Sequence, residues 1–417
     1  MLYAPDRHEP LRAQTWDEGR VRAAIADIAQ EALTQRDASG HWRVHPQDDE
    51  GDEPPGGFKS LYLGSAGVWW ALWSLQRAGL IALPVDPAAQ VRPLGADYRA
   101  APDSGQIEPS LMNGETGVLL VQWCITGSTV AADRLHEVVA ANLGHPAHEA
   151  HLGAAGTMLA AVHLWRATGE QRWRDLLLRN ADALWQAWHF DEAAGCWLWT
   201  QELYGKRAQY LGAAHGFAGN VCALLKAADL LDATRQQQLH ERSLLTLRRL
   251  ARWHEGTVNW PPGLWTPRPG VPPLFMQWCH GAPGIVTAFA DFPLAQSPEM
   301  DAMLLAAGEA VWRAGPLAKG AGLCHGTAGN GMAFLKLYRR SGDAVWLQRA
   351  RAFAMHAITQ CATARATHGR GWPTLMTGDL GLAIYLWRCI EGRAEFPLLD
   401  DDPSLRPVPV PAGVATR

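Results

Sequence analysis

A Gly-x-x-Gly signature that recurs seven times constrains the fold of this 417-residue chain more than any other feature. Each copy opens an apolar stretch of helical character, such as residues 157–165, 221–231 and 382–389. One copy would carry little weight among 41 glycines, but seven copies that each open an apolar run indicate a repeat. The seven pairs are Gly64/Gly67, Gly114/Gly117, Gly153/Gly156, Gly216/Gly219, Gly281/Gly284, Gly326/Gly329 and Gly378/Gly381.

Amphipathic segments with the period of a helix lie between the apolar stretches. In residues 17–34, for example, Val21, Ile25 and Ile28 recur on one face. Residues 80–108 are the poorest repeat, because they are rich in Pro and Gly and show no convincing outer helix. Strand patterns are nearly absent from the sequence. The other amphipathic segments span residues 174–188, 235–253, 300–314 and 344–361.

An apolar inner layer and an amphipathic outer layer predict an all-α fold, an α/α toroid of seven inner and seven outer helices. The alternative is an open solenoid, which would need polar capping repeats that neither end of the sequence shows. In a toroid the glycine-rich turns lie at one end of the ring, so residues far apart in sequence converge there. We predict one toroid domain over residues 1–398 and a Pro-rich, disordered tail over residues 399–417.

The tripeptide Cys-His-Gly occurs twice, which is hard to credit to chance in a chain with 7 cysteines and 16 histidines. A third signature is preceded by His alone. Thiolate and imidazole are the preferred ligands of zinc. Two patterns remain open on spacing: a Cys2His site with an open position, typical of catalytic zinc, and a closed Cys2His2 site, typical of structural zinc. The candidate ligands are Cys279, His280, Cys324, His325 and His215.

Composition excludes several other classes of function. A net charge of −4 provides no large basic field for nucleic acid. No run of 18 apolar residues suggests a transmembrane segment, and no signal peptide is evident at the N-terminus. The seven cysteines are odd in number and lie in apolar or glycine-rich contexts, which is typical of a cytoplasmic protein with reduced thiols.

Three longer motifs surround the Cys-His-Gly and His-Gly signatures. They are Trp-Cys-His-Gly-Ala-Pro-Gly at 278–284, Lys-Gly-Ala-Gly-Leu-Cys-His-Gly-Thr-Ala-Gly-Asn at 319–330 and Gly-Ala-Ala-His-Gly-Phe-Ala-Gly at 212–219. At these motifs the chain resembles the lanthionine synthetase C-like family, and the likeness extends to all seven signatures. The motif at 278–284 is more similar to the glutathione-binding, eukaryotic-type branch than to the lantibiotic cyclases. The resemblance implies an α/α toroid with one Zn2+ per chain, held by Cys279, Cys324 and His325.

The resemblance also implies further site residues. His215 would be an acid/base group near the metal, and Glu149 occupies a position where family members often carry an acid that faces the site. Lys319 matches a lysine of the glutathione-binding branch and would bind a carboxylate or phosphate, or else remain solvated. From its position directly after the candidate ligand Cys279, we expect His280 to face the cavity and either contact substrate or pack the loop. For Asp379 we expect only the role of an acid at a helix start.

The implied activity is zinc-dependent addition of a thiol to dehydroalanine or dehydrobutyrine, which forms a thioether. The thiol would come from a peptide Cys or from glutathione, and the partner would be a dehydrated peptide or protein. We see no dehydratase or kinase domain, so another enzyme would have to act upstream in trans. The alternative is a non-catalytic zinc- and glutathione-binding scaffold or sensor. A glycosidase would need two opposed carboxylates, and no acid recurs convincingly on the seven loops.

Overall fold

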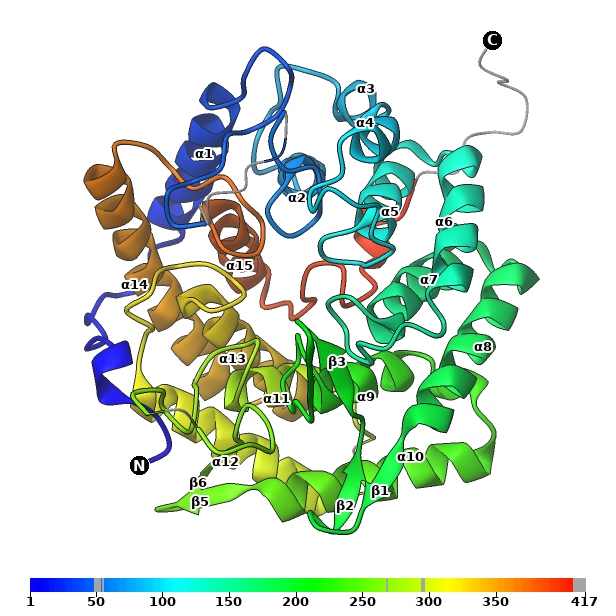
Figure 1. Cartoon of the computed structure of the whole chain (residues 1–417). Coiled ribbons are helices and arrows are strands. Elements are labelled where there is room, and N and C mark those ends of the chain that lie inside the picture. Colours follow the sequence, from blue (N-terminus) through cyan, green and yellow to red (C-terminus); the bar gives the residue numbers. More distant parts are fainter. Residues whose placement is uncertain (49–53, 55, 268, 294–296, 408–417) are drawn as a thin grey trace.

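A computed structural model of the chain describes residues 1–48, 54, 56–267, 269–293 and 297–407. In these residues, helices form two concentric layers arranged as a ring (Figure 1). The inner helices are α2 (Ser65–Arg77), α5 (Glu115–Thr126), α7 (Ala154–Thr168), α9 (Phe217–Lys226), α11 (Ala282–Phe289), α13 (Thr327–Ser341) and α15 (Asp379–Glu391). The outer helices are α1 (Glu18–Thr34), α3 (Pro87–Val91) with α4 (Leu94–Ala100), α6 (Thr129–Ala141), α8 (Gln171–Ala187), α10 (Ala233–Leu250), α12 (Pro298–Ala314) and α14 (Ala344–His368).

The inner layer closes on itself. Each inner helix contacts the next, and α15 returns to contact α2. The outer helices pack on the inner ones, as α8 does on α7 and α14 on α13. The structure thus confirms the predicted α/α toroid of seven inner and seven outer positions for the described residues and excludes an open solenoid.

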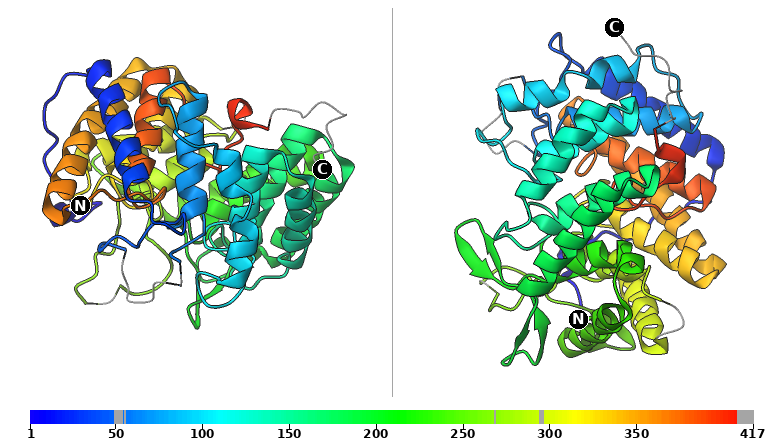
Figure 2. Two further views of the ribbon diagram at one scale, coloured as in Figure 1. Left: turned by 90° about the horizontal axis from the view of Figure 1, so that it is seen from above. Right: turned by 90° about the vertical axis from the view of Figure 1, so that its right-hand side faces the viewer.

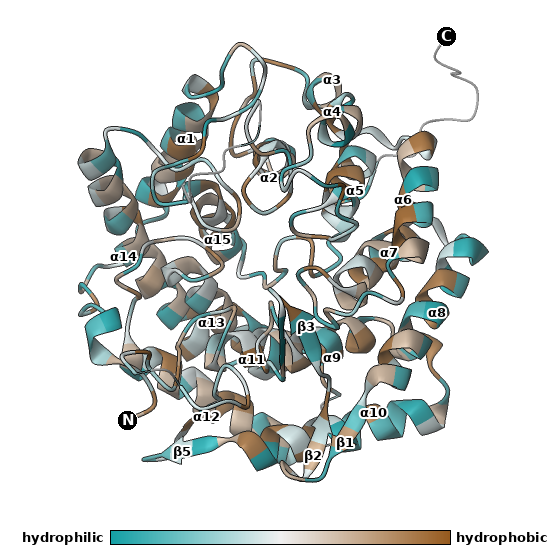
Figure 3. Cartoon of the chain, viewed as in Figure 1, coloured by the Kyte–Doolittle hydropathy of each residue, from teal (hydrophilic) through white to brown (hydrophobic). Residues whose placement is uncertain are grey.

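The two layers differ in burial as the sequence pattern predicts. In α13 every residue from Thr327 to Leu337 is buried. In the outer helix α10 only one face is buried, by residues such as Leu239, Ser243 and Leu247, and hydrophilic colours cover much of this helix in Figure 3. Among the described residues, we find no helix that combines the length and the apolar character needed to cross a bilayer.

The second glycine of each signature lies in the first turn of an inner helix, beneath the loop that leads into that helix. A Cβ atom at these seven positions would lie between 1.8 and 2.4 Å from the carbonyl oxygen of the residue six positions earlier. At Gly329 the distance to the Leu323 oxygen would be 1.8 Å. Any side chain would push the loop off the helix, so the glycine repeat allows the loops to pack tightly at one end of the ring.

Two local features differ from the sequence-based expectations. Residues 80–108 do form outer structure, as the short helices α3 and α4; α3 starts with Pro87, which is tolerated at the first helical position, and Asp86 caps it. The described residues also contain strands, in three antiparallel hairpins within the loops. Each strand has three residues, too few for a period-two pattern to show in the sequence. The pairs are β1 (His189–Asp191) with β2 (Cys196–Leu198), β3 (Gln201–Leu203) with β4 (Lys206–Ala208), and β5 (Arg252–His254) with β6 (Thr257–Asn259).

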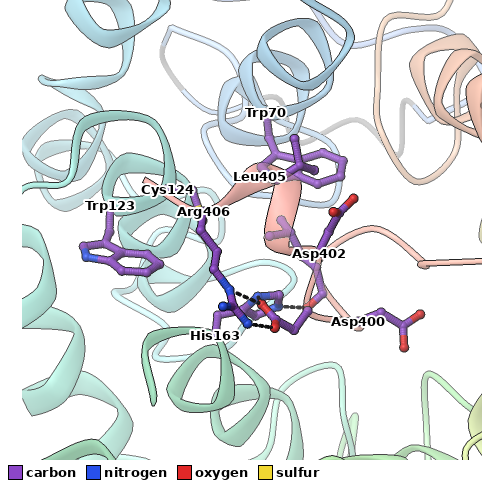
Figure 4. A pocket seen from close by; sticks show the side chains of 10 residues that line it. Trp70, Trp123, Cys124, His163, Asp400, Asp402, Leu405 and Arg406 are labelled. Carbon is purple, nitrogen blue, oxygen red and sulfur yellow. Dashed lines mark hydrogen bonds and ion pairs between the residues drawn. The ribbon is translucent and has the colours of Figure 1, made fainter. Parts of the chain in front are cut away.

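The segment that follows α15 crosses the end of the ring opposite the glycine-rich loops (Figure 2, left). It meets inner helices near their C-terminal ends: Arg77 Nε of α2 donates to the Ser404 carbonyl at 3.1 Å, and the ring of His163 in α7 lies 2.9 Å from the Leu398 carbonyl. A small cavity lies between this segment and the ring (Figure 4).

The expected tail boundary at residue 398 therefore differs from the structure. Residues 399–407 pack on the ring, and Asp400, Asp402 and Leu405 are buried; residues 408–417 lie outside the described residues. The acidic run, which suggested a solvated tail, is instead neutralised by cations of the ring. Asp400 pairs with Lys336 at 2.7 Å and with Lys226, and Asp402 pairs with Arg388 at 2.6 Å.

Removal of the Asp400 charge should destabilise the fold strongly. In Asp400→Asn the fully buried Lys336 ammonium would lose its counter-charge, which typically costs about 3–5 kcal/mol of unfolding free energy. Asp401→Asn is the matched control, because Asp401 pairs with the more exposed Arg406 and should lose less than about 1 kcal/mol. Chemical denaturation measures both. Equal stability of Asp400→Asn and the unchanged protein would contradict this account of the segment.

Candidate metal centre and active site

The loops that precede the inner helices are tied together by backbone hydrogen bonds around one end of the ring. In the described chain, five residues located two positions before a signature's first glycine donate N–H to the carbonyl of the equivalent residue in the next loop. Residues distant in sequence thus share one belt. The bonds are Tyr62 to Met112 (2.9 Å), Met112 to His151 (3.4 Å), Cys279 to Cys324 (3.1 Å), Cys324 to Met376 (2.7 Å) and Met376 to Tyr62 (3.4 Å).

On this belt the three predicted zinc ligands come together. The ligand atoms of Cys279, Cys324 and His325 all lie within 4.8 Å of one another, and no other His, Cys, Asp or Glu group in the described residues meets this criterion. Both cysteines are buried, with 7% and 4% of their surface exposed. The loops before α11 and α13 supply the group, and a loop lets the adjacent Cys324 and His325 face one point. His280 and His215 are not part of the group.

The two thiols are electrostatically coupled. The adjoining Cys324 thiol, with help from His325, lowers the pKa of Cys279 well below its ordinary value, although burial opposes this. The Cys279 sulfur and burial raise the pKa of Cys324 well above its ordinary value. Ionisation of the Cys279 thiol thus disfavours ionisation of the buried Cys324 thiol beside it. A divalent cation would remove this repulsion and allow both thiols to ionise, which is the donor chemistry that zinc requires.

Polar side chains hold the ligand group from both sides. Gln277 Nε2 donates to the Cys279 sulfur at 3.0 Å, and Arg7 Nη2 donates to the Gln277 side-chain oxygen at 3.2 Å. The Tyr62 hydroxyl bonds to Cys324, and burial, with this sulfur, raises the pKa of Tyr62 well above its ordinary value. Tyr62 therefore remains a neutral donor to the sulfur.

His215 lies beside this group and is held by Glu149. The His215 Nδ1 atom is 2.8 Å from Glu149 Oε2, and the Glu149 side chain is fully buried. Burial alone would lower the pKa of His215, but the bond to Glu149 outweighs burial and raises it. Burial alone would raise the pKa of Glu149, and the same bond lowers it. The pair thus favours imidazolium against carboxylate, with the Nδ1–H pointing at Glu149.

The other predicted site residues take different places. His280 is buried, its ring lies 6.0 Å from that of His215, and burial lowers its pKa; we find no partner for its Nδ1 among the described residues. Lys319 is exposed, yet its positive charge partly opposes the rise in the pKa of Cys324. Asp379 is the first residue of α15 and accepts from the Trp372 N–H at 2.9 Å.

Three residues near the candidate ligands were not predicted: Asp48, Tyr62 and His151. Asp48 lies in no motif of the sequence; it accepts from the Trp372 indole and from the Thr377 hydroxyl at 2.8 Å. Burial raises its pKa, and the charges of His325 and Lys319 oppose this. Tyr62 and His151, by contrast, could have been found: when the seven signatures are aligned on their first glycine, both fall in the column of Cys279 and Cys324.

Known proteins are similar in sequence to the part of the chain that contains the candidate ligands. Residues 197–399 match the family described as lanthionine synthetase C-like protein. The chain is 32% identical over 220 residues to glutathione S-transferase LANCL1 of Danio rerio, covering 50% of this chain and 49% of that protein. It is 34% identical over 209 residues to LanC-like protein GCL1 of Arabidopsis thaliana, covering 49% and 45%. The chain spans about half the length of the curated relatives it matches.

A solved structure extends the likeness in fold to nearly the whole chain. Nisin cyclase superposes with a TM-score of 0.61 at 14% sequence identity, over 91% of this chain and 96% of that chain. The matched family region contains the metal-ligand group and His215, and both relatives are eukaryotic. Residues 197–399 therefore belong to the lanthionine synthetase C-like family, and the sequence relatives of this chain are of its eukaryotic type.

Proposed function

We propose that the protein adds a thiol to the β-carbon of a dehydroalanine or dehydrobutyrine residue, which forms a thioether, with one zinc ion held by Cys279, Cys324 and His325. The observation that carries the proposal is the proximity of this ligand group to His215, an imidazole held by a buried carboxylate. The charge of Cys279 acts on His215 and contributes to its raised pKa. The names of the zebrafish relative, a glutathione S-transferase, and of nisin cyclase support thiol chemistry.

Two thiols and one imidazole suit zinc, and three protein donors leave a position for a substrate. A zinc ion held there would lower the pKa of an incoming thiol and keep its sulfur nucleophilic at neutral pH. The proton that the thiol releases passes to solvent. After the carbon–sulfur bond forms, the His215 imidazolium donates its proton to the α-carbon and then regains one from solvent, so that no proton is gained or lost overall. Glu149 holds His215 in one tautomer and stabilises its charged form.

Glutathione is the thiol donor that the surroundings favour. Its carboxylates would find cations in Lys319, whose charge reaches Cys324, and in Arg7, which is linked through Gln277 to Cys279. A cysteine within a peptide offers no such free carboxylates. The electrophile would be a peptide or protein that a separate dehydratase or kinase has modified in trans.

Mass spectrometry of a dehydroalanine peptide incubated with the zinc-loaded protein tests the proposal. We expect a glutathione adduct only when protein and glutathione are both present at a pH where the uncatalysed reaction is slow. A peptide that cyclises on its own cysteine without glutathione would instead indicate a cyclase. Glutathione binding without any adduct would indicate a non-catalytic scaffold or sensor and would contradict the proposal.

The pH dependence of the rate tests the role of Glu149. Since Glu149 raises the pKa of His215, Glu149→Gln should lower that pKa. The His215 imidazolium then loses its proton at a lower pH, so the fall of the rate on the alkaline side of the pH profile should also begin at a lower pH. The rate of the variant relative to the unchanged protein should therefore be smaller at pH 8 than at pH 6. Glu202→Gln, on the exposed side of β3, is the control, and an unchanged alkaline side of the profile in Glu149→Gln would exclude the coupling.

A further inference from the structure

His151 occupies the position in the third loop that Cys279 and Cys324 occupy in the fifth and sixth loops. All three residues lie two positions before the first glycine of a signature. The His151 carbonyl is part of the backbone belt, since it accepts from Met112 N–H at 3.4 Å. The repeat that directs two cysteine side chains to the metal group therefore directs the His151 ring to the same region. His151 is nevertheless outside the group of potential ligands.

The His151 ring contacts both halves of the site. Its centroid lies 5.0 Å from that of His215 and 5.1 Å from that of Tyr62, the residue that bonds to Cys324. Glu149 Oε2 accepts from the His151 backbone N–H at 2.9 Å and from His215 at 2.8 Å. One carboxylate oxygen thus fixes the positions of both histidines relative to each other.

The His151 residue is mostly buried, but its ring nitrogens remain accessible to solvent. Only 7% of the residue is exposed, and burial lowers the pKa of His151 to about 4. The ring is therefore neutral at pH 7, with one N–H donor and one acceptor nitrogen. In the described residues we find no hydrogen bond to either ring nitrogen. A neutral ring nitrogen that has no protein partner and is accessible to solvent can donate its N–H to a substrate.

We propose that His151 is a catalytic residue that donates a ring N–H hydrogen bond to the enolate oxygen of the dehydroamino acid; this rests on the proposed function. Thiolate addition forms the sulfur–Cβ bond and breaks the carbon–carbon π bond, whose electron pair moves to the carbonyl oxygen. The enolate then collapses when His215 protonates the α-carbon. The charge on oxygen appears only during the reaction, so a donor aimed at it lowers the barrier without holding the substrate.

A neutral imidazole suits this role beside a protonated one. A charged His151 would repel the His215 imidazolium, whose ring lies 5.0 Å away. The repulsion would lower the pKa of His215 and leave less of it protonated beside Glu149. A neutral His151 donates a hydrogen bond and leaves the proton transfer to His215. The two histidines would thereby have separate roles. His151 stabilises the negative charge on the enolate oxygen, and His215 then supplies the proton to the α-carbon.

Two substitutions separate donation from packing. His151→Phe keeps a ring between Tyr62 and His215 but has no donor, whereas His151→Gln keeps an N–H donor. We expect His151→Phe to lower kcat by roughly 10²–10³-fold, as for loss of one oxyanion donor, with the KM for glutathione within about twofold. His151→Gln should retain at least about ten times the kcat of His151→Phe. His136→Phe, which replaces a histidine packed on Trp173 in the outer layer, is the control for a generic effect.

Zinc content and thermal midpoint are measured for every variant, and His151→Leu replaces His151→Phe if the latter fails to fold. A kcat of His151→Phe within about threefold of the unchanged protein, or equal losses in the Gln and Phe variants, would overturn the donor role in favour of packing. The unchanged protein reports on the proposed function separately. If it forms no adduct, the proposed function fails and this inference fails with it; if it forms the adduct, the variants decide on His151 alone.

Discussion

Cys324→Ala is expected to abolish zinc binding. The variant removes one of three protein ligands, and the remaining Cys279 and His325 cannot hold the ion against competing buffer and thiols. We expect the zinc content to fall from about one ion per chain to below about one tenth, because ligand loss removes binding free energy that a preformed site depends on. Metal analysis after dialysis measures the content, and addition of glutathione to the dehydroalanine peptide should stop as well.

Cys196→Ala is the matched control for the loss of a thiol. Cys196 is fully buried but lies on strand β2, outside the group of potential ligands. It should keep its zinc and lose only the stability of a truncated core side chain. A Cys324→Ala protein that still carries about one zinc ion at unchanged affinity would exclude Cys324 as a ligand.

His215→Ala is expected to separate catalysis from metal binding. His215 is not part of the ligand group, so the variant should contain as much zinc as the unchanged protein. Loss of the acid should slow addition by roughly 10²-fold or more, the usual contribution of general acid–base catalysis. Single-turnover rates with a dehydroalanine peptide and saturating glutathione measure this effect.

His254→Ala provides the comparison, since His254 is exposed on β5 and should leave the rate unchanged. Buried Glu149 would lose its ring partner in His215→Ala, so a thermal midpoint is needed beside the rate. A His215→Ala protein that is folded, zinc-loaded and as fast as the unchanged protein would remove His215 from the mechanism.

The ring was predictable because its determinant repeats. Seven glycine signatures mark seven tight loop–helix junctions, and steric contact explains the need for glycine at the second position of each. The short hairpins were not predictable, because three-residue strands leave no period in the sequence. The packing of residues 399–407 was missed since an acidic run reads as solvated, and the cations that neutralise it, such as Lys336, lie far away in sequence.

The candidate site could be predicted where residue type is distinctive. Cys-His-Gly indicated three candidate ligands, and the structure places their ligand atoms within 4.8 Å of one another. Asp48 could not be found in this way, because its place depends on tertiary contacts with Trp372 and Thr377. His151 was missed for a different reason: its position in the repeat matches that of Cys279, but an isolated histidine has no motif of its own.

Zinc K-edge X-ray absorption of the purified protein, before and after addition of glutathione, tests the central claim most directly. Before addition we expect two protein sulfurs at about 2.3 Å and one imidazole nitrogen at about 2.0 Å from the zinc ion, with a solvent oxygen as the fourth ligand. Glutathione should replace that fourth ligand with a third sulfur. A spectrum with four protein donors that does not change when glutathione is added would contradict an open, thiol-accepting zinc site.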